Sequence, residues 1–294
     1  MRLRNWVVPH GPTDAIDIAL RLTLIVLLLR PMGPWYVAAF VLLLAVVGLV
    51  SVPVQRAPAT WLVLAALIAT HLVVDWPLPD NHLYLLAYWC LGVGIALRLG
   101  EPARALARTG RQLLGLVFVF AVVWKAALSP DYRDGRFFAV TLLTDERFAD
   151  AVQLVGGLTR AELRESREYL QPLSEGAELL DPPTLHATPR FWWMVRAATW
   201  GGLLLEALVA LLWLAPIRRR ALLLVRHGVV LAFCMATYAF APVAGFGWLL
   251  LVMGMATTAA DQRGLRTAYV IAYCVVLLYA EIPWAGLVVD GLMP

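Results

Sequence analysis

Long apolar runs alternate with short polar segments along most of this 294-residue chain. A helix that crosses the hydrocarbon core of a bilayer needs about twenty mostly apolar residues. Nine runs of about this length lie near residues 13–30, 33–51, 60–77, 81–99, 111–128, 194–215, 221–238, 242–260 and 267–286. Prolines and glycines fall largely between the runs, as in "LRPMGP" and "DWPLPDN", where turns are expected. We therefore predict an all-α, polytopic transmembrane helical bundle of about nine spans.

One connection, residues 129–193, is much longer than the others. Its stretch "TRAELRESREYLQPL" reads as a helix, with Thr159 as a candidate N-cap and Glu162 three residues later. Aromatic residues distributed along it provide apolar anchors, which favours a partly helical cap over a disordered linker. The predicted organisation is transmembrane helices 1–5 in residues 1–128, an extracytoplasmic cap loop in 129–193 and transmembrane helices 6–9 in 194–294.

Composition agrees with a lipid environment. Hydrophobic residues make up 61% of the chain, charged residues 15%, and the mean hydropathy is +0.75, which is more apolar surface than a soluble domain can bury. The sequence pI of about 9.1 reflects charge sorting at a membrane and does not indicate a nucleic-acid partner. The N-terminus lacks the pattern of a cleaved signal peptide, so we expect the first helix to be retained. The arginine-rich, lysine-poor usage suggests a bacterial protein of the inner membrane.

The arginines of the short loops set the expected orientation. Placing the N-terminus in the cytoplasm leaves Arg30 as the single base of the short outer loops, together with Asp75 and Asp80. The basic residues that then lie inside are Arg2, Arg4, Arg56, Arg98, Arg104, Arg108, Arg111, Arg218, Arg219, Arg220, Arg263 and Arg266. This bias is typical of cytoplasmic loops, and it places the long loop and the C-terminus outside.

Ionisable side chains inside spans are costly unless they are paired or face a cavity, so each is a candidate functional residue. Some have a simple structural explanation. Asp17 and Arg21 are four residues apart and are expected to neutralise each other. His227 and Glu281 lie near the ends of spans, where packing or contact with head groups explains them.

Four others converge on the outer side. His82 opens the fourth predicted span, and Lys125 lies about one turn from the outer end of the fifth. His71 lies on the outer half of the third span, four residues before Asp75, and Glu206 lies within the sixth. The predicted topology therefore gathers a polar cluster beneath the long outer loop.

Lys125 is the only lysine in the chain, whereas every other Lys or Arg position is arginine. Arginine stays charged, but a buried amine can become neutral and accept a proton. Proton abstraction and Schiff-base formation are the reactions that need lysine in place of arginine. The alternative is a lysine that extends its ammonium group to the interface as an anchor.

Three stretches resemble the membrane (HTTM) domain of the vitamin K-dependent gamma-carboxylase family. "DNHLYLLAYWCLGVGIALRL" (80–99) is similar to the start of the family's asparagine–histidine–x–tyrosine–leucine helix. "RQLLGLVFVFAVVWKAALSPDYRDG" (111–135) is similar to its helix that ends in alanine, lysine and an Asp–aromatic turn, although the turn here is two residues longer. "GGLLLEALVALLWLAPIRRRALLLVRHGVVLAF" (201–233) is similar to its Gly-Gly…Glu helix with the basic turn and histidine helix that follow.

The resemblance implies a chemistry and the residues that carry it. In the family's carboxylases the matching lysine deprotonates a hydroquinone, whose anion reacts with oxygen to form a stronger base. Carried over, Lys125 is the base, and His82 and Asn81 hold the quinol oxygen as the other two catalytic residues. The remaining residues expected at the substrate site are Tyr84, Trp124, His71, Asp75, Asp131 and Glu206. The family's large extramembrane substrate domain has no counterpart in this sequence, so carboxylation of a protein substrate is not expected.

Two functions follow from these observations. The first is a membrane-embedded enzyme whose lysine base acts on a quinol or another lipid-soluble substrate at the outer face. The second is a non-catalytic membrane subunit that binds a lipid, a quinone or the helices of a partner protein. A secondary transporter fits less well, because the sequence has no inverted repeat. Cys90, Cys234 and Cys274 have no metal-ligand spacing, so we predict no metal site.

Overall fold

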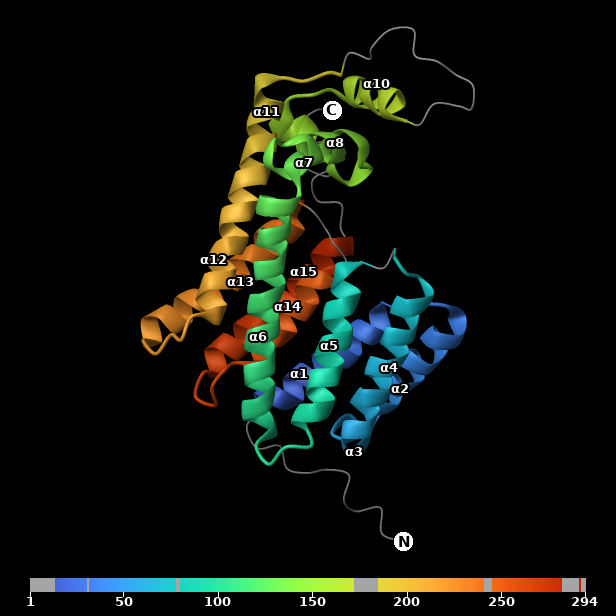
Figure 1. Cartoon of the computed structure of the whole chain (residues 1–294), viewed down its shortest axis with the longest axis vertical. Helices are drawn as coiled ribbons and strands as arrows, with labels where there is room; N and C mark the ends of the chain where they lie inside the picture. The colour runs from blue at the N-terminus through green and yellow to red at the C-terminus, as the bar shows by residue number, and fades with distance from the viewer. Residues whose placement is uncertain are drawn as a thin grey trace. The chain divides into compact units, whose positions relative to one another are not determined.

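The computed structural model describes residues 14–30, 32–77, 80–171, 185–240, 245–281 and 291. All regular elements within these ranges are helices (Figure 1), which confirms the all-α prediction for this part of the chain. Contacts between Cα atoms divide the chain into two compact units. Unit 1 comprises Met1–Leu114 and Gly245–Cys274, and unit 2 comprises Gly115–Ala244 and Val275–Pro294. The segment expected to form the cap falls entirely within unit 2.

Unit 1 is built around completely buried indoles. Its elements are α1 (Ala15–Leu29), α2 (Trp35–Val50), α3 (Val52–Gln55), α4 (Pro58–Val74), α5 (Asn81–Ala96), the first part of α6 (Pro102–Val123), α14 (Phe246–Ala256) and most of α15 (Arg263–Glu281). Trp61 and Trp89 are both fully buried. The Trp61 Nε1 donates to the Gln55 carbonyl at 2.7 Å, and the Trp89 Nε1 donates to the Thr23 hydroxyl at 2.9 Å. These bonds satisfy the polar atom of each ring and fix α4 and α5 against their neighbours.

The expected pairing of Asp17 with Arg21 is corrected by the structure. Arg56, which follows α3, contacts both carboxylate oxygens of Asp17, at 2.9 and 2.6 Å. Arg56 approaches from another element and can bind both carboxylate oxygens at once, a geometry that Arg21, one turn away on the same helix, reaches less well. The ion pair therefore connects the start of α1 to the turn after α3 and does not lie along one helix face.

Unit 2 contains the rest of α6 and the elements that follow it. They are η1 (Trp124–Leu128), α7 (Pro130–Arg133), α8 (Arg136–Thr144), η2 (Glu146–Phe148), α9 (Ala149–Ala151), η3 (Val152–Gly156), α10 (Arg160–Leu170), α11 (Pro189–Arg196), η4 (Ala197–Gly201), α12 (Gly202–Leu214) and α13 (Arg220–Phe240). Of these, η1, η3 and η4 are π-helical, with one residue more in each hydrogen-bonded turn than an α-helix. Segments η1 and η4 continue the long helices that contain α6 and α12.

The described residues 129–171 and 185–193, here called the cap, form helices with a hydrophobic core shared with α11. Figure 1 shows α7, α8 and α10 gathered beside α11. The core consists of Ala139, Leu142, Leu143, Val152, Leu158, Leu163, Phe191 and Val195. The predicted N-cap is confirmed: the Thr159 hydroxyl accepts from the Glu162 N–H, and the Glu162 carboxylate accepts from the Thr159 N–H. The described part of the long connection is therefore folded.

Three helices in the described part of the chain are long and apolar enough to cross a membrane. They cover Pro102–Leu128, Pro189–Leu214 and Arg220–Tyr238, each with a mean hydropathy of 1.7. Other expected spans correspond to shorter helices, such as α2 with 16 residues, α4 with 17 and α14 with 11. Nine spans therefore stay a prediction, and the structure supports a membrane protein with at least these candidate spans.

Candidate functional site

Lys125 lies near the end of a 27-residue apolar helix that consists of α6 and η1. Glu206 lies on α12, one turn after η4. The Lys125 ammonium group donates a hydrogen bond to the Glu206 Oε1. The two side chains are only 24% and 12% exposed. The lysine singled out by the sequence therefore has a carboxylate partner in a largely buried position.

Both members of the pair are next to a π-helical segment. Lys125 is the second residue of η1, and Glu206 follows η4 by one helical turn. A π-helical turn is uncommon and occurs frequently at functional sites. Here the wider turns change the directions of the side chains on two helices that contribute to one ion pair.

Tyr132 on α7 completes the local group. Its side chain is 3% exposed, and it packs against Phe137 and Phe138 with ring centroids at 5.7 and 5.4 Å. The Lys125 ammonium lies 5.1 Å from the centre of the Tyr132 ring, which allows a cation–π interaction. Burial, and then the nearby Glu206 carboxylate, raise the pKa of Tyr132. Its hydroxyl therefore stays protonated and can act as a hydrogen-bond donor.

The second carboxylate oxygen of Glu206 is the unusual feature of this group. Glu206 Oε2 is buried and has no hydrogen-bond partner within the described residues. A Cβ placed on Gly202, one turn earlier on α12, would lie 3.5 Å from the Tyr132 hydroxyl, so this tyrosine reaches the same helix face. A buried carboxylate oxygen without a donor is costly. The group therefore contains an acceptor ready for an additional O–H or N–H donor.

Two other expected residues of unit 2 point elsewhere. Trp124 is 62% exposed on the surface of η1. Asp131 has a side chain that is 65% exposed and forms an ion pair with Arg136 at 2.7 Å. Neither residue contributes an atom to the Lys125–Glu206–Tyr132 group.

The remaining expected residues belong to unit 1. His71 is buried on α4, with its Nδ1 3.1 Å from the Asp75 carboxylate, although the approach is too oblique for a hydrogen bond. Asn81 begins α5 and is exposed. The His82 Nε2 lies 3.8 Å from the Asp80 carboxylate. The expected site residues are thus divided into two local groups, one in each unit.

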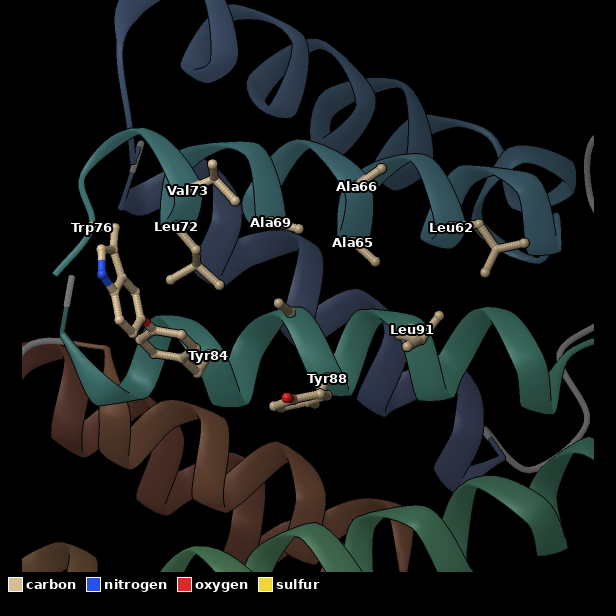
Figure 2. A pocket seen from close by; sticks show the side chains of 11 residues that line it. Leu62, Ala65, Ala66, Ala69, Leu72, Val73, Trp76, Tyr84, Tyr88 and Leu91 are labelled. Carbon is tan, nitrogen blue, oxygen red and sulfur yellow. The ribbon is translucent and has the colours of Figure 1, made fainter.

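Tyr84, the last expected residue, lines a groove of about 710 Å³ between α4 and α5. Figure 2 shows Tyr84 beside Trp76 at one end of this groove, with Leu62 and Leu91 toward the other end. The lining is almost entirely aliphatic and aromatic. A volume of this size is ordinary for a small-molecule site.

Comparison with known proteins gives no relative to guide this assignment. No protein-family model, curated protein or solved structure matches the chain. The likeness to gamma-carboxylases therefore rests on the three sequence stretches quoted above. No group of three or more His, Cys, Asp or Glu side chains that could hold a metal ion lies within the described ranges.

Tyr132 is the functional candidate that sequence analysis did not name. It stands in the turn "SPDYRDG", which was recognised for its Asp–aromatic pattern. An aromatic residue just beyond a long apolar helix is usually an interfacial anchor. Two features of the sequence could have indicated a buried position for Tyr132: it follows Lys125 by seven residues, and the aromatic pair Phe137 and Phe138 comes soon after it in the chain.

Proposed function

We propose that this chain is an inner-membrane protein whose Lys125 and Glu206 together take a proton from a lipid-soluble substrate at the outer face. Nine spans, a cytoplasmic N-terminus and an extracytoplasmic cap complete the arrangement. The arginine distribution supports this topology, and the three long apolar helices support a location in a membrane. The observation that carries the function is the buried Glu206 Oε2, which has no donor among the residues that the structure describes.

The pair has a simple way to produce a neutral base. Moving one proton from the Lys125 ammonium to the Glu206 carboxylate leaves an amine and a carboxylic acid, with no change in total charge. The amine can then accept a proton from a substrate hydroxyl, whose O–H bond breaks as the N–H bond forms. The resulting anion lies beside the Lys125 ammonium, and the protonated Tyr132 hydroxyl is a neighbouring hydrogen-bond donor.

A quinol is the substrate class that fits these groups best. A phenol and an alkylamine have reference pKa values of about 10 and about 10.4, so proton transfer between them is nearly balanced. The hydroxyl of such a substrate would satisfy the orphaned Glu206 oxygen. The resemblance to the gamma-carboxylases also implies roles for Asn81 and His82, but these residues belong to unit 1, and the proposal here rests on the groups of unit 2 alone. The residues present are therefore chemically compatible with a quinone or hydroquinone ligand.

A non-catalytic membrane subunit is the second candidate function. Trp192 and Trp193, which are consecutive on α11, are 47% and 68% exposed. Large exposed aromatic side chains are common where one protein docks on another and where a protein meets the membrane interface. In this case the ion pair of Lys125 and Glu206 holds two helices together and performs no chemistry.

Organic extraction and mass spectrometry of the purified protein separate the two functions. We expect wild-type protein to retain a quinone or isoprenoid lipid that Lys125→Ala protein loses. Lys125→Arg keeps the positive charge but not the base, and we expect it to be inactive in a functional assay of the host cell. Equal circular dichroism and gel-filtration profiles serve as the folding control. Full activity of Lys125→Arg, or no ligand in any correctly folded form, would favour the subunit.

A further inference from the structure

The groove between α4 and α5 is long and apolar, and its lining includes no residue of the Lys125 group. It is lined along its length by small side chains, Ala65, Ala66, Ala69 and Ala87, with Leu62 and Leu91 toward one end and Leu72 toward the other. From Leu62 to Val73 the helix rises about 16 Å at about 1.5 Å per residue. Space exists here because alanines occupy positions where larger side chains would fill the gap between two paired helices. The shape therefore suits an extended hydrocarbon chain.

One end of the groove is chemically different from the rest. Trp76 and Tyr84 lie beside each other there, whereas Tyr88 lies further along the groove toward Leu91, as Figure 2 shows. Tryptophan and tyrosine rings of this kind are typical of the level of lipid head groups. The polar head of a bound lipid would lie at this end, with its chain directed toward Leu62 and Leu91.

Two acidic residues are close in sequence to the residues at this end. Asp75 immediately precedes Trp76 and has a side chain that is 45% exposed, and Asp80 stands at the N-cap position of α5, without a side-chain cap hydrogen bond, and is 75% exposed. Their nearest ionic neighbours within the described residues are the imidazoles of His71 and His82. Two partly exposed carboxylates favour a head group with a positive charge that donates hydrogen bonds.

We propose that the groove binds one membrane lipid with a primary ammonium head group, of the phosphatidylethanolamine class. One hydrocarbon chain lies along the alanine strip, and the ammonium group lies near Asp75 and Asp80. This inference rests on the membrane placement proposed above but not on proton transfer by Lys125. It assigns a lipid-binding role to α4 and α5 that the proposed reaction does not require.

Native mass spectrometry of protein released from nanodiscs of mixed phosphatidylethanolamine and phosphatidylcholine tests the proposal. Ala69→Leu and Ala87→Leu fill the groove, and we expect retention of the ethanolamine lipid to weaken about tenfold, which corresponds to about 1.4 kcal/mol. Ala39→Leu makes the same change at an exposed position of α2 outside the groove and should retain the lipid. Asp75→Asn with Asp80→Asn should reduce the preference for ethanolamine over choline while a chain is still bound.

Three outcomes would overturn the proposal. They are equal lipid retention by the Ala69→Leu and Ala39→Leu proteins, equal binding of both head groups by wild-type protein, and a quinone that wild-type protein retains and Ala69→Leu protein loses. Lys125→Ala serves as a separate control, because it should retain the ethanolamine lipid. Loss of that lipid in Lys125→Ala would show that the groove and the Lys125 group are one site, which also contradicts the inference. Failure of the proton-transfer proposal alone leaves the Ala69→Leu result unchanged.

Discussion

At the scale of single residues, the identity of residue 125 has a physical explanation. An arginine at this position would pair with Glu206 at least as well, because its guanidinium group binds a carboxylate through two bonds. Lysine is the side chain that can pair with Glu206 and also give up its proton. A lone lysine in an arginine-rich chain, bonded to a carboxylate with a free oxygen, is therefore better suited to proton transfer than to structural pairing alone.

Removal of one member of the ion pair should destabilise the protein more than removal of both. Glu206→Leu leaves the Lys125 ammonium largely buried without a partner, and we expect a loss of about 3 kcal/mol in the free energy of unfolding. Lys125→Met combined with Glu206→Leu should recover most of that loss, because two apolar side chains of similar size pack together. Thermal unfolding of the purified protein in detergent measures both. If the double variant is no more stable than Glu206→Leu, the charges are not coupled.

The residues of the site were predictable to different degrees. Lys125 is evident from composition alone, and Glu206 from its position in an apolar run. Their direct bond could not be predicted, because sequence does not determine which helix faces meet. The pairing of Asp17 with Arg56 shows the same difficulty, since a contact across 39 positions replaced the local one. Tyr132 was missed because a buried aromatic residue and an interfacial one have the same sequence signal.

At the scale of helices, the presence of a helix was easier to predict from the sequence than the residues at which it begins and ends. The fifth expected span begins at residue 111, but α6 begins at Pro102. Its first turns, "PARALARTG", contain two arginines and were assigned to a loop by their polarity. Alanine and arginine are good helix formers, and proline is favourable in the first turn. The helix therefore begins before the apolar run. Its π-helical end has no recognisable sequence pattern.

Close packing of α6 against α14 gives a prediction for Gly110. A Cβ at this position would lie 2.9 Å from the Met253 carbonyl oxygen, a backbone atom that cannot move aside easily. Gly110→Ala should therefore cost about 1–3 kcal/mol of stability. Gly228 on α13 is the matched control, because a Cβ there meets nothing within 4 Å, and Gly228→Ala should stabilise by up to about 1 kcal/mol. Denaturant unfolding measures the stability of both variants. Similar effects of Gly110→Ala and Gly228→Ala would contradict the close packing of Gly110 against the Met253 carbonyl.

The capping box of α10 gives a prediction about pH. Hydrogen bonds from the Thr159 N–H and hydroxyl lower the pKa of Glu162. A carboxylate with a lowered pKa in the folded state stabilises the helix above its unfolded pKa of about 4.3, and this contribution is lost as the pH falls through the folded value. Hydrogen exchange should therefore show α10 amides losing protection below about pH 4.3 in wild type. Glu162→Gln keeps the capping geometry without titrating, so unchanged acid sensitivity in that variant would exclude Glu162 as the cause.

At the scale of the whole molecule, composition predicted the class and the helices, while the number of spans depends on loops and helix ends. Topology is testable by cysteine labelling in a Cys274→Ala background, since Cys274 is the exposed native thiol and Cys90 and Cys234 are buried. Glu168→Cys, on α10, should react with a membrane-impermeant thiol reagent in intact cells. Arg219→Cys, in the basic turn before α13, should react only after the membrane is permeabilised. The reverse pattern would invert the proposed orientation.

The π-helical segment η4 has a consequence for how this chain tolerates changes in length. Each of its hydrogen-bonded turns holds one residue more than an α-helical turn, so η4 accommodates a surplus residue before Glu206. Deleting one residue between Ala197 and Gly201 would let the segment become α-helical while Glu206 keeps its direction. Forcing α-helical geometry without a deletion would instead rotate Glu206 by about 100° away from Lys125. Conversion of η4 to an α-helix therefore preserves the direction of Glu206 only if one residue is deleted from the segment at the same time.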